Sequence, residues 1–69
     1  MAKKEINFET NQIQFILKQQ GKDKQWLAKE LEIDETIVGD WCENNSQPSF
    51  IHLFKAAKIL NKEPKNLYL

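Results

Sequence analysis

Apolar residues between positions 22 and 49 recur at helical spacing. Leu27 and Leu31 are four residues apart, and Val38 and Trp41 are three apart. Residues at these spacings share one face of a helix, so the pattern predicts two short helices, over 24–31 and 35–44. Two short helices joined by a tight turn are typical of a helix-turn-helix, whose second helix is presented outward.

The connection between these two helices carries two further signals. Ile33 lies in the turn and is expected to fill the corner between the helices. Ala28 follows Leu27, and its methyl side chain allows two helix backbones to cross closely. Asp23 and Asp34 precede the two helices and are predicted to cap them, because aspartate accepts hydrogen bonds from exposed backbone N–H groups.

The flanking segments predict three more helices. A first helix over 9–20 would bury Ile13, Ile16 and Leu17 and end at a left-handed Gly21. Ser49 is the expected cap of a fourth helix that ends near Asn61, a residue that tolerates positive φ. Its expected core stripe consists of Phe50, Leu53, Phe54, Ala57 and Leu60. A short fifth helix is predicted from Pro64, with Leu67 turned inward, and no strand is expected.

Composition agrees with one small all-α domain. The chain has 69 residues, 41% of them hydrophobic, and we expect a compact bundle of five short helices. Residues 1–8 are predicted to form an arm and residues 9–69 a single domain, with the helix-turn-helix at about 24–44. Apolar runs are too short for a membrane span, and one cysteine suits a reducing cytoplasm.

The sequence contains few residues suited to catalysis or metal binding. His52 is the single histidine, and we interpret it as a surface residue near the cap at Ser49. Together with Cys42 it supplies two metal ligands, fewer than the four of structural zinc. Two glycines cannot build a phosphate-binding loop. The sequence therefore predicts no enzyme, no metal, no cofactor and no small-molecule substrate.

The whole arrangement resembles a known family. The helix-turn-helix run KDKQWLAKELEIDETIVGDWCENNSQPS is preceded by NQIQFILKQQGK and followed by QPSFIHLFKAAKILNKEPKNL. These elements, in this order, resemble the XRE family, the Cro and lambda-repressor-like helix-turn-helix domains, over about 59 residues (11–69). One departure is Glu32, where the family usually has a glycine at positive φ. A glutamate there should cost about 1 kcal/mol.

The resemblance implies double-stranded DNA as the partner. The helix over 35–44 would enter the major groove, and the start of the preceding helix would contact the backbone. The outward, base-facing positions are Glu35, Thr36, Gly39, Asp40 and Glu43. They lie opposite Val38 and Trp41 on the helix. The expected backbone contacts are Lys22, Lys24, Gln25, Asn44, Asn45 and Ser46.

Charge opposes this expectation. Residues 22–47 hold three lysines and seven acidic residues, a net charge of −4, while the rest of the chain carries +4. DNA affinity depends on neutralised phosphates, and the chain has no arginine to read guanine. Three features could compensate: a carboxylate of Glu35 or Asp40 accepting from cytosine N4, Lys3 and Lys4 on the arm, and dimerisation.

Two functions follow. The first is a sequence-specific transcriptional regulator of a prokaryote or phage that occupies a promoter or operator. The alternative is a degenerate helix-turn-helix that binds another protein through its acidic helix. A homodimer is expected from apolar residues beyond the needs of the core, namely Phe15, Ile51 and two of the three residues Leu67–Leu69, unless these pack against Ile6 and Phe8 of the arm. Trp26 suits either a place under the first helix or one beside bound DNA.

Overall fold

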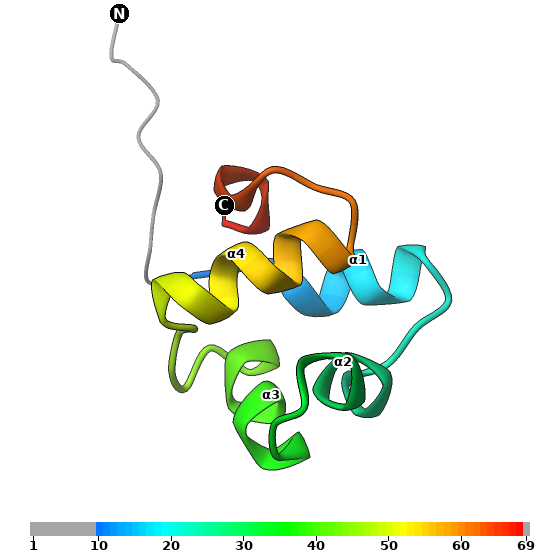
Figure 1. Ribbon diagram of the computed structural model, residues 1–69, viewed down its shortest axis with the longest axis vertical. Helices are drawn as coiled ribbons and strands as arrows, with labels where there is room; N and C mark the ends of the chain where they lie inside the picture. Colours follow the sequence, from blue (N-terminus) through cyan, green and yellow to red (C-terminus); the bar gives the residue numbers. More distant parts are fainter. Residues whose placement is uncertain (1–9, 69) are drawn as a thin grey trace, which may run out of the picture.

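The computed structural model describes residues 10–68, which fold into four α-helices and one short 3₁₀ helix (Figure 1). The elements are α1 (Ile13–Gln19), α2 (Lys24–Leu31), α3 (Glu35–Cys42), α4 (Phe50–Ile59) and η1 (Pro64–Leu67). The all-α prediction is confirmed, but the expected fifth α-helix is a single 3₁₀ turn. It is four residues long, and Tyr68 continues in extended conformation, with φ −114°.

Helix α4 lies at the centre of the fold. The α2–α3 pair is on one side of it and η1 on the other (Figure 1). Within residues 10–68 no helix combines the length and the apolar character needed to cross a membrane.

Side-chain caps begin three of the helices as predicted. Asp23 accepts from the N–H of Trp26 at 2.8 Å, and Asp34 accepts from the N–H of Thr36 at 2.8 Å. Ser49 Oγ accepts from the N–H of His52 at 3.3 Å. Helix α2 has the predicted bounds, whereas α3 ends at Cys42 rather than at residue 44, because residue 44 has left-handed backbone (φ 60°).

Helix α1 begins at Ile13, later than the predicted residue 9. Asn11 forms an antiparallel bridge with Tyr68, and its Oδ1 accepts from the N–H of Ile13 at 2.9 Å. The chain before Ile13 is thereby held against the end of the domain instead of continuing the helix. The expected arm, with Lys3, Lys4, Ile6 and Phe8, lies outside the described residues.

The core is built from one apolar face of each α-helix and from the end of the chain. Its buried hydrophobic residues are Ile13, Ile16, Leu17, Leu27, Ala28, Leu31, Val38, Trp41, Leu53, Ala56, Ala57, Leu60, Leu67 and Tyr68. The predicted stripe of α4 is wrong for Phe50 and Phe54, which are 75% and 60% exposed. The buried row contains Ala56 instead, because small side chains let α4 approach its neighbours closely.

The predictions for the apolar residues beyond the core are confirmed in part, and those for the left-handed turns are confirmed. Phe15 and Ile51 are exposed as expected, and Leu67 is buried as predicted. Tyr68 is buried against expectation, because its bridge to Asn11 folds this segment onto the core. Residue 69 is outside the described range. The left-handed backbone predicted at Gly21, Glu32 and Asn61 is confirmed, with φ values of 69°, 58° and 59°.

Candidate nucleic-acid interface

Helices α2 and α3 form the predicted helix-turn-helix and make the most extensive contact between two elements of the fold. Glu32 turns the chain after α2, and Ile33, half-buried, packs against the core at the corner. Ala28 is buried, and Val38 and Trp41 of α3 point inward. Because these residues occupy the inner side of α3, its opposite side is free to face a partner.

That opposite side forms the acidic face, a shallow depression of about 410 Å³. It is lined by Lys24, Asp34, Glu35, Thr36, Gly39, Asp40 and Glu43. The side chains of Glu35, Thr36 and Glu43 are exposed, and Asp40 is half-buried. All five residues that we expected to face bases therefore lie in one depression on α3.

Gly39 differs from the others, because it is buried although it lies on the outer side of α3. The Lys24 side chain covers it. A Cβ at Gly39 would lie 3.6 Å from Lys24 Nζ and 3.7 Å from Lys24 Cδ. The sequence prediction of an outward Gly39 is thus right for its side of the helix but not for its exposure.

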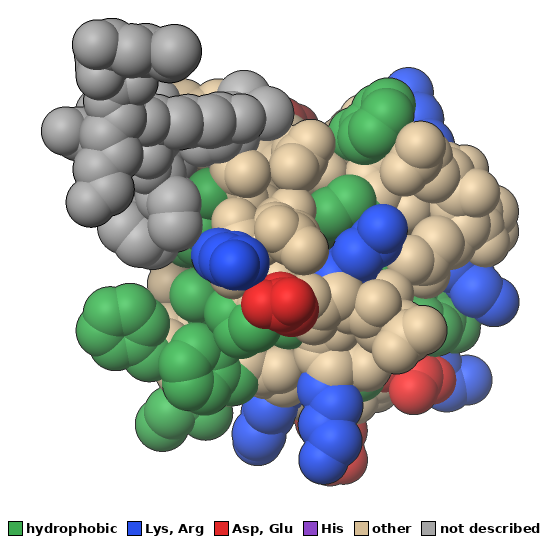
Figure 2. All heavy atoms as spheres, turned by 90° about the horizontal axis from the view of Figure 1, so that it is seen from above, with side chains coloured by type: hydrophobic (Ala, Val, Ile, Leu, Met, Phe, Trp, Pro, Cys, Tyr) green, Lys and Arg blue, Asp and Glu red, His purple; other side chains and the backbone are tan. Residues whose placement is uncertain are grey.

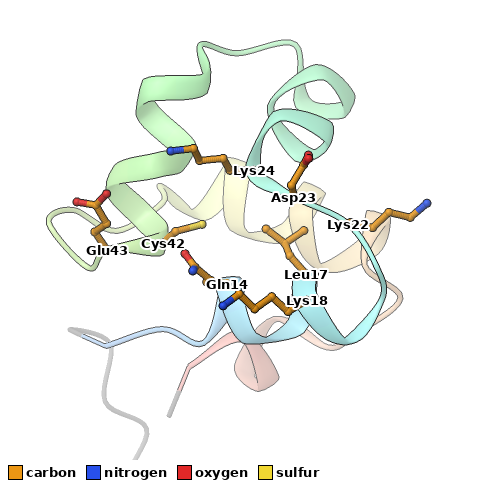
Figure 3. Close-up of a pocket in the computed structure, with 8 residues that line it drawn as sticks. All are labelled: Gln14, Leu17, Lys18, Lys22, Asp23, Lys24, Cys42 and Glu43. Carbon is orange, nitrogen blue, oxygen red and sulfur yellow. The ribbon is translucent and has the colours of Figure 1, made fainter.

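A second depression, the lysine hollow, lies at the start of α2 and has a volume of about 390 Å³. Its lining consists of Gln14, Leu17, Lys18, Lys22, Asp23, Lys24, Cys42 and Glu43 (Figure 3). It brings α1 against the start of α2 and the end of α3. Gln14 and Lys18 of α1 were not among the predicted contacts, although their spacing of four residues places them on one helix face.

The lysines of this hollow are directed differently. Figure 3 shows the Lys24 amine reaching across to α3, whereas the Lys22 amine points away from it. Lys22 Nζ lies 4.9 Å from the ring centroid of Trp26, a cation–π contact. Trp26 is itself half-buried and packs on the core. Gln25, another predicted backbone contact, is exposed on α2.

The loop after α3 is held by internal hydrogen bonds. Asn44 Oδ1 accepts from the N–H of Asn11 at 2.7 Å and from Gln47 Nε2 at 3.0 Å. The backbone N–H groups of Asn45 and Ser46 donate to the carbonyl of Asp40. Asn45 Nδ2 also donates to Glu43 Oε1 at 3.3 Å. Asn45 and Ser46 remain exposed, while the Asn44 acceptor fixes the loop on Asn11, in the segment before α1.

Two ionisable groups of the interface have shifted pKa values. Hydrogen bonds from Thr36, chiefly from its backbone N–H, hold the pKa of Asp34 below its usual value. Burial raises the pKa of the Cys42 thiol, and the nearby charge of Lys24 opposes this shift in part. Cys42 is half-buried at the end of α3 and packs against the core.

The charged groups that line the two depressions do not pair with one another within the described residues. Within residues 10–68, neither Lys24 nor the carboxylates of α3 form an ion pair; Lys65 pairs with Glu63 at 3.8 Å on the η1 side. In the same range no three His, Cys, Asp or Glu side chains converge as a metal site. The arrangement offers donors and acceptors to an external polar partner.

Fold and interface together define a protein with a helix-turn-helix-like fold. No family model matches the chain, and no curated protein matches it. Among solved structures it is similar to one described as a putative DNA-binding protein from Bacteroides fragilis. The two are 35% identical, the match covers 87% of this chain and 97% of the other, and the TM-score is 0.82. The chain belongs to the family of that Bacteroides fragilis protein.

Proposed function

We propose that the protein binds double-stranded DNA as a small transcriptional regulator of the XRE type. The observation that carries this proposal is the outward polar side of α3. A helix-turn-helix presents it, on the fold of a protein described as a putative DNA-binding protein. In this mode α3 enters the major groove and regulation follows from occupying a promoter or operator. The role involves no catalysis and belongs in the cytoplasm of a prokaryote or with a phage genome.

The two depressions divide the contacts with DNA. The lysine hollow faces the backbone, where Lys18 and Lys22 neutralise phosphates and release counterions. The acidic face meets base edges, where the Asp40 or Glu35 carboxylate accepts from the amino group of cytosine. Asn45, Ser46 and Gln25 add hydrogen bonds to the backbone from their exposed positions.

Selection from a random duplex library tests this function. We expect enrichment of a common motif, with an affinity for it that falls steeply as salt is raised. The same library, incubated with the immobilising matrix but without protein, measures the enrichment that the matrix alone causes. No enrichment, together with no binding to any duplex at low salt, would contradict the proposal.

A second function has an observation in its favour. The outward side of α3 carries carboxylates that attract cationic partners more readily than phosphates, and the segment 22–47 has a net charge of −4. In this alternative the chain is an adapter whose acidic face contacts a basic protein. Failure of the DNA selection, with a partner interaction that is lost on Asp40→Asn, would support the adapter.

Dimerisation belongs to the regulatory proposal. Phe50, Ile51 and Phe54 of α4 are 75%, 67% and 60% exposed, and hydrophobic side chains gather at one edge of the molecule in Figure 2. Exposed apolar clusters often mark contacts between subunits, and two copies would match a palindromic site. Sedimentation should show a dimer at micromolar concentration that Phe54→Ser weakens, with Ile37→Ser, at an exposed apolar residue of α3, as the control. A monomer at all concentrations, with one protomer on each DNA site, would exclude it.

A further inference from the structure

The Lys24 side chain lies against α3, although its backbone is at the start of α2. Lys24 is the first residue of α2, at the edge of the lysine hollow, yet its side chain crosses to α3 and lies over Gly39 (Figure 3). Both the Cδ and the Nζ atoms are within 4 Å of the place where a Cβ of Gly39 would be. The whole outer half of the lysine side chain therefore lies along α3 and points away from the side of α2.

Position 39 is the middle of the groove-facing row. Glu35 and Glu43 are four residues before and after it, so they are its neighbours on the helix surface. Thr36 and Asp40 line the same depression. The Lys24 ammonium thus stands among the side chains expected to meet base edges, as the one positive group among four carboxylates and a hydroxyl. Within residues 10–68 it makes no ion pair, so its N–H donors are available.

We propose that Lys24 is a specificity-determining residue that donates to the O6 and N7 atoms of a guanine, while a carboxylate of α3 accepts from a cytosine amino group. The inference rests on the proposed DNA binding and names the base pair it selects, a G·C pair in the major groove. Guanine presents two acceptors there and cytosine presents one donor. A lysine ammonium beside carboxylates offers the complementary set of charges. Arginine is the side chain that most often recognises guanine, and this chain has none. Lys24 would take that role.

Gly39 makes this placement of Lys24 possible. A side chain limited to Cβ would touch Lys24 at ordinary van der Waals distance, so alanine fits at this position. A larger side chain would occupy the space through which the Lys24 chain runs and would push the ammonium off α3. Position 39 therefore controls where Lys24 donates, without contacting the base itself.

The test compares Lys24→Met with Lys22→Met on the duplex that the wild-type chain selects and on duplexes with each base pair changed. Methionine is one atom shorter than lysine but keeps most of the apolar contact of the lysine chain, and it removes the charge. For Lys24→Met we expect the preference at one G·C pair to fall roughly 5- to 150-fold, with the other positions read as before. For Lys22→Met we expect all duplexes to bind more weakly by one common factor, with a salt slope reduced by about one.

Variants of Gly39 give the second arm. Gly39→Leu should lose preference at the same G·C pair as Lys24→Met, and Gly39→Ala should keep it. Thermal unfolding of each variant shows whether the fold is intact; should Gly39→Leu fail to fold, Lys24→Met decides alone.

A uniform loss on all duplexes for Lys24→Met would make Lys24 a phosphate contact. That result overturns the inference and leaves DNA binding in place. A wild-type chain that selects no duplex would overturn the proposed function and this inference together.

Discussion

The lysine hollow and the acidic face lie side by side and share Lys24 and Glu43, yet they oppose each other in charge. The hollow brings Lys18, Lys22 and Lys24 together, whereas four carboxylates line the face on α3. In the proposed binding mode the first surface attracts any DNA, since phosphates are the same in every sequence. The second repels phosphates, and it gains energy only where a base edge offers a donor.

This separation indicates how a neutral protein could be selective. Specificity is the difference between two affinities, and unfavourable contacts with the wrong partner increase it as effectively as favourable contacts with the right one. Carboxylates on a groove-facing helix lower affinity for random DNA. The proposed regulator would then depend on its few base contacts more than a basic helix-turn-helix does.

The largest effect should follow from removing the attraction of the hollow. Lys18→Ala combined with Lys22→Ala should weaken binding to all duplexes, by about tenfold for each lost phosphate contact near 0.1 M salt, and reduce the salt slope by about two. Lys58→Ala with Lys62→Ala, both exposed and outside the lining of the hollow, removes the same net charge. Equal losses in both double variants would show that net charge acts, and not the hollow.

The relative placement of the two surfaces depends on the packing of α2 on α3. Ala28 is buried and lies on α2, so Ala28→Leu should overpack the helix pair and lower the free energy of unfolding by about 1–3 kcal/mol. Urea denaturation measures the change. Lys29→Leu adds the same side chain at the neighbouring exposed position and should leave the midpoint nearly unchanged. A midpoint unaffected by Ala28→Leu would remove this residue from the helix crossing.

A smaller effect should separate repulsion from base reading on α3. Asp40→Asn removes a negative charge, so affinity for random DNA should rise severalfold, the size expected for one weak, screened charge interaction. It also removes the preference for a cytosine amino group, so discrimination between selected and random duplexes should fall. Affinities for selected and random duplexes measure both quantities. Glu30→Gln, an exposed acid on α2, is the matched control. Equal strengthening on every duplex would show that Asp40 repels without reading.

The smallest effect should be on how the free energy of unfolding depends on pH, through the Asp34 cap of α3. The pKa of Asp34 is lowered in the folded state by hydrogen bonds from Thr36, so the unfolded chain binds the proton more readily. The cap therefore stabilises the fold above the ordinary pKa of aspartate, about 4, and this contribution is lost as the pH falls through the lower folded value. Asp34→Ser keeps a neutral cap, and its denaturation midpoint should depend less on acid. Parallel loss in both proteins would locate the acid sensitivity elsewhere.

Local signals predicted the helix-turn-helix well. Asp23, Asp34 and Ser49 each cap the helix that follows them, because a capping side chain needs only the two or three residues after it. The left-handed turn at Gly21 is local for the same reason, whereas the one at Glu32 was expected from the family resemblance. The outward row of α3 at 35, 36, 39, 40 and 43 was implied by the family resemblance, and helix geometry agrees with it because these positions lie opposite Val38 and Trp41.

Long-range contacts account for the errors. Asn11 lies 57 residues from Tyr68, and no local pattern indicates that they pair and thereby shorten α1 and bury the chain end. Phe50 and Phe54 are as hydrophobic as core residues, so only the approach of neighbouring helices to Ala56 and Ala57 shows which side of α4 is buried.

The sequence by itself therefore determined an all-α chain, the caps, the turns and the pair of helices that presents α3, because each depends on residues within one or two helical turns. Only the tertiary structure decided how Lys18 and Lys22 come to line one hollow and how the Lys24 side chain comes to cover Gly39. Those contacts join separate helices, and their geometry depends on how closely the buried side chains let the helices pack.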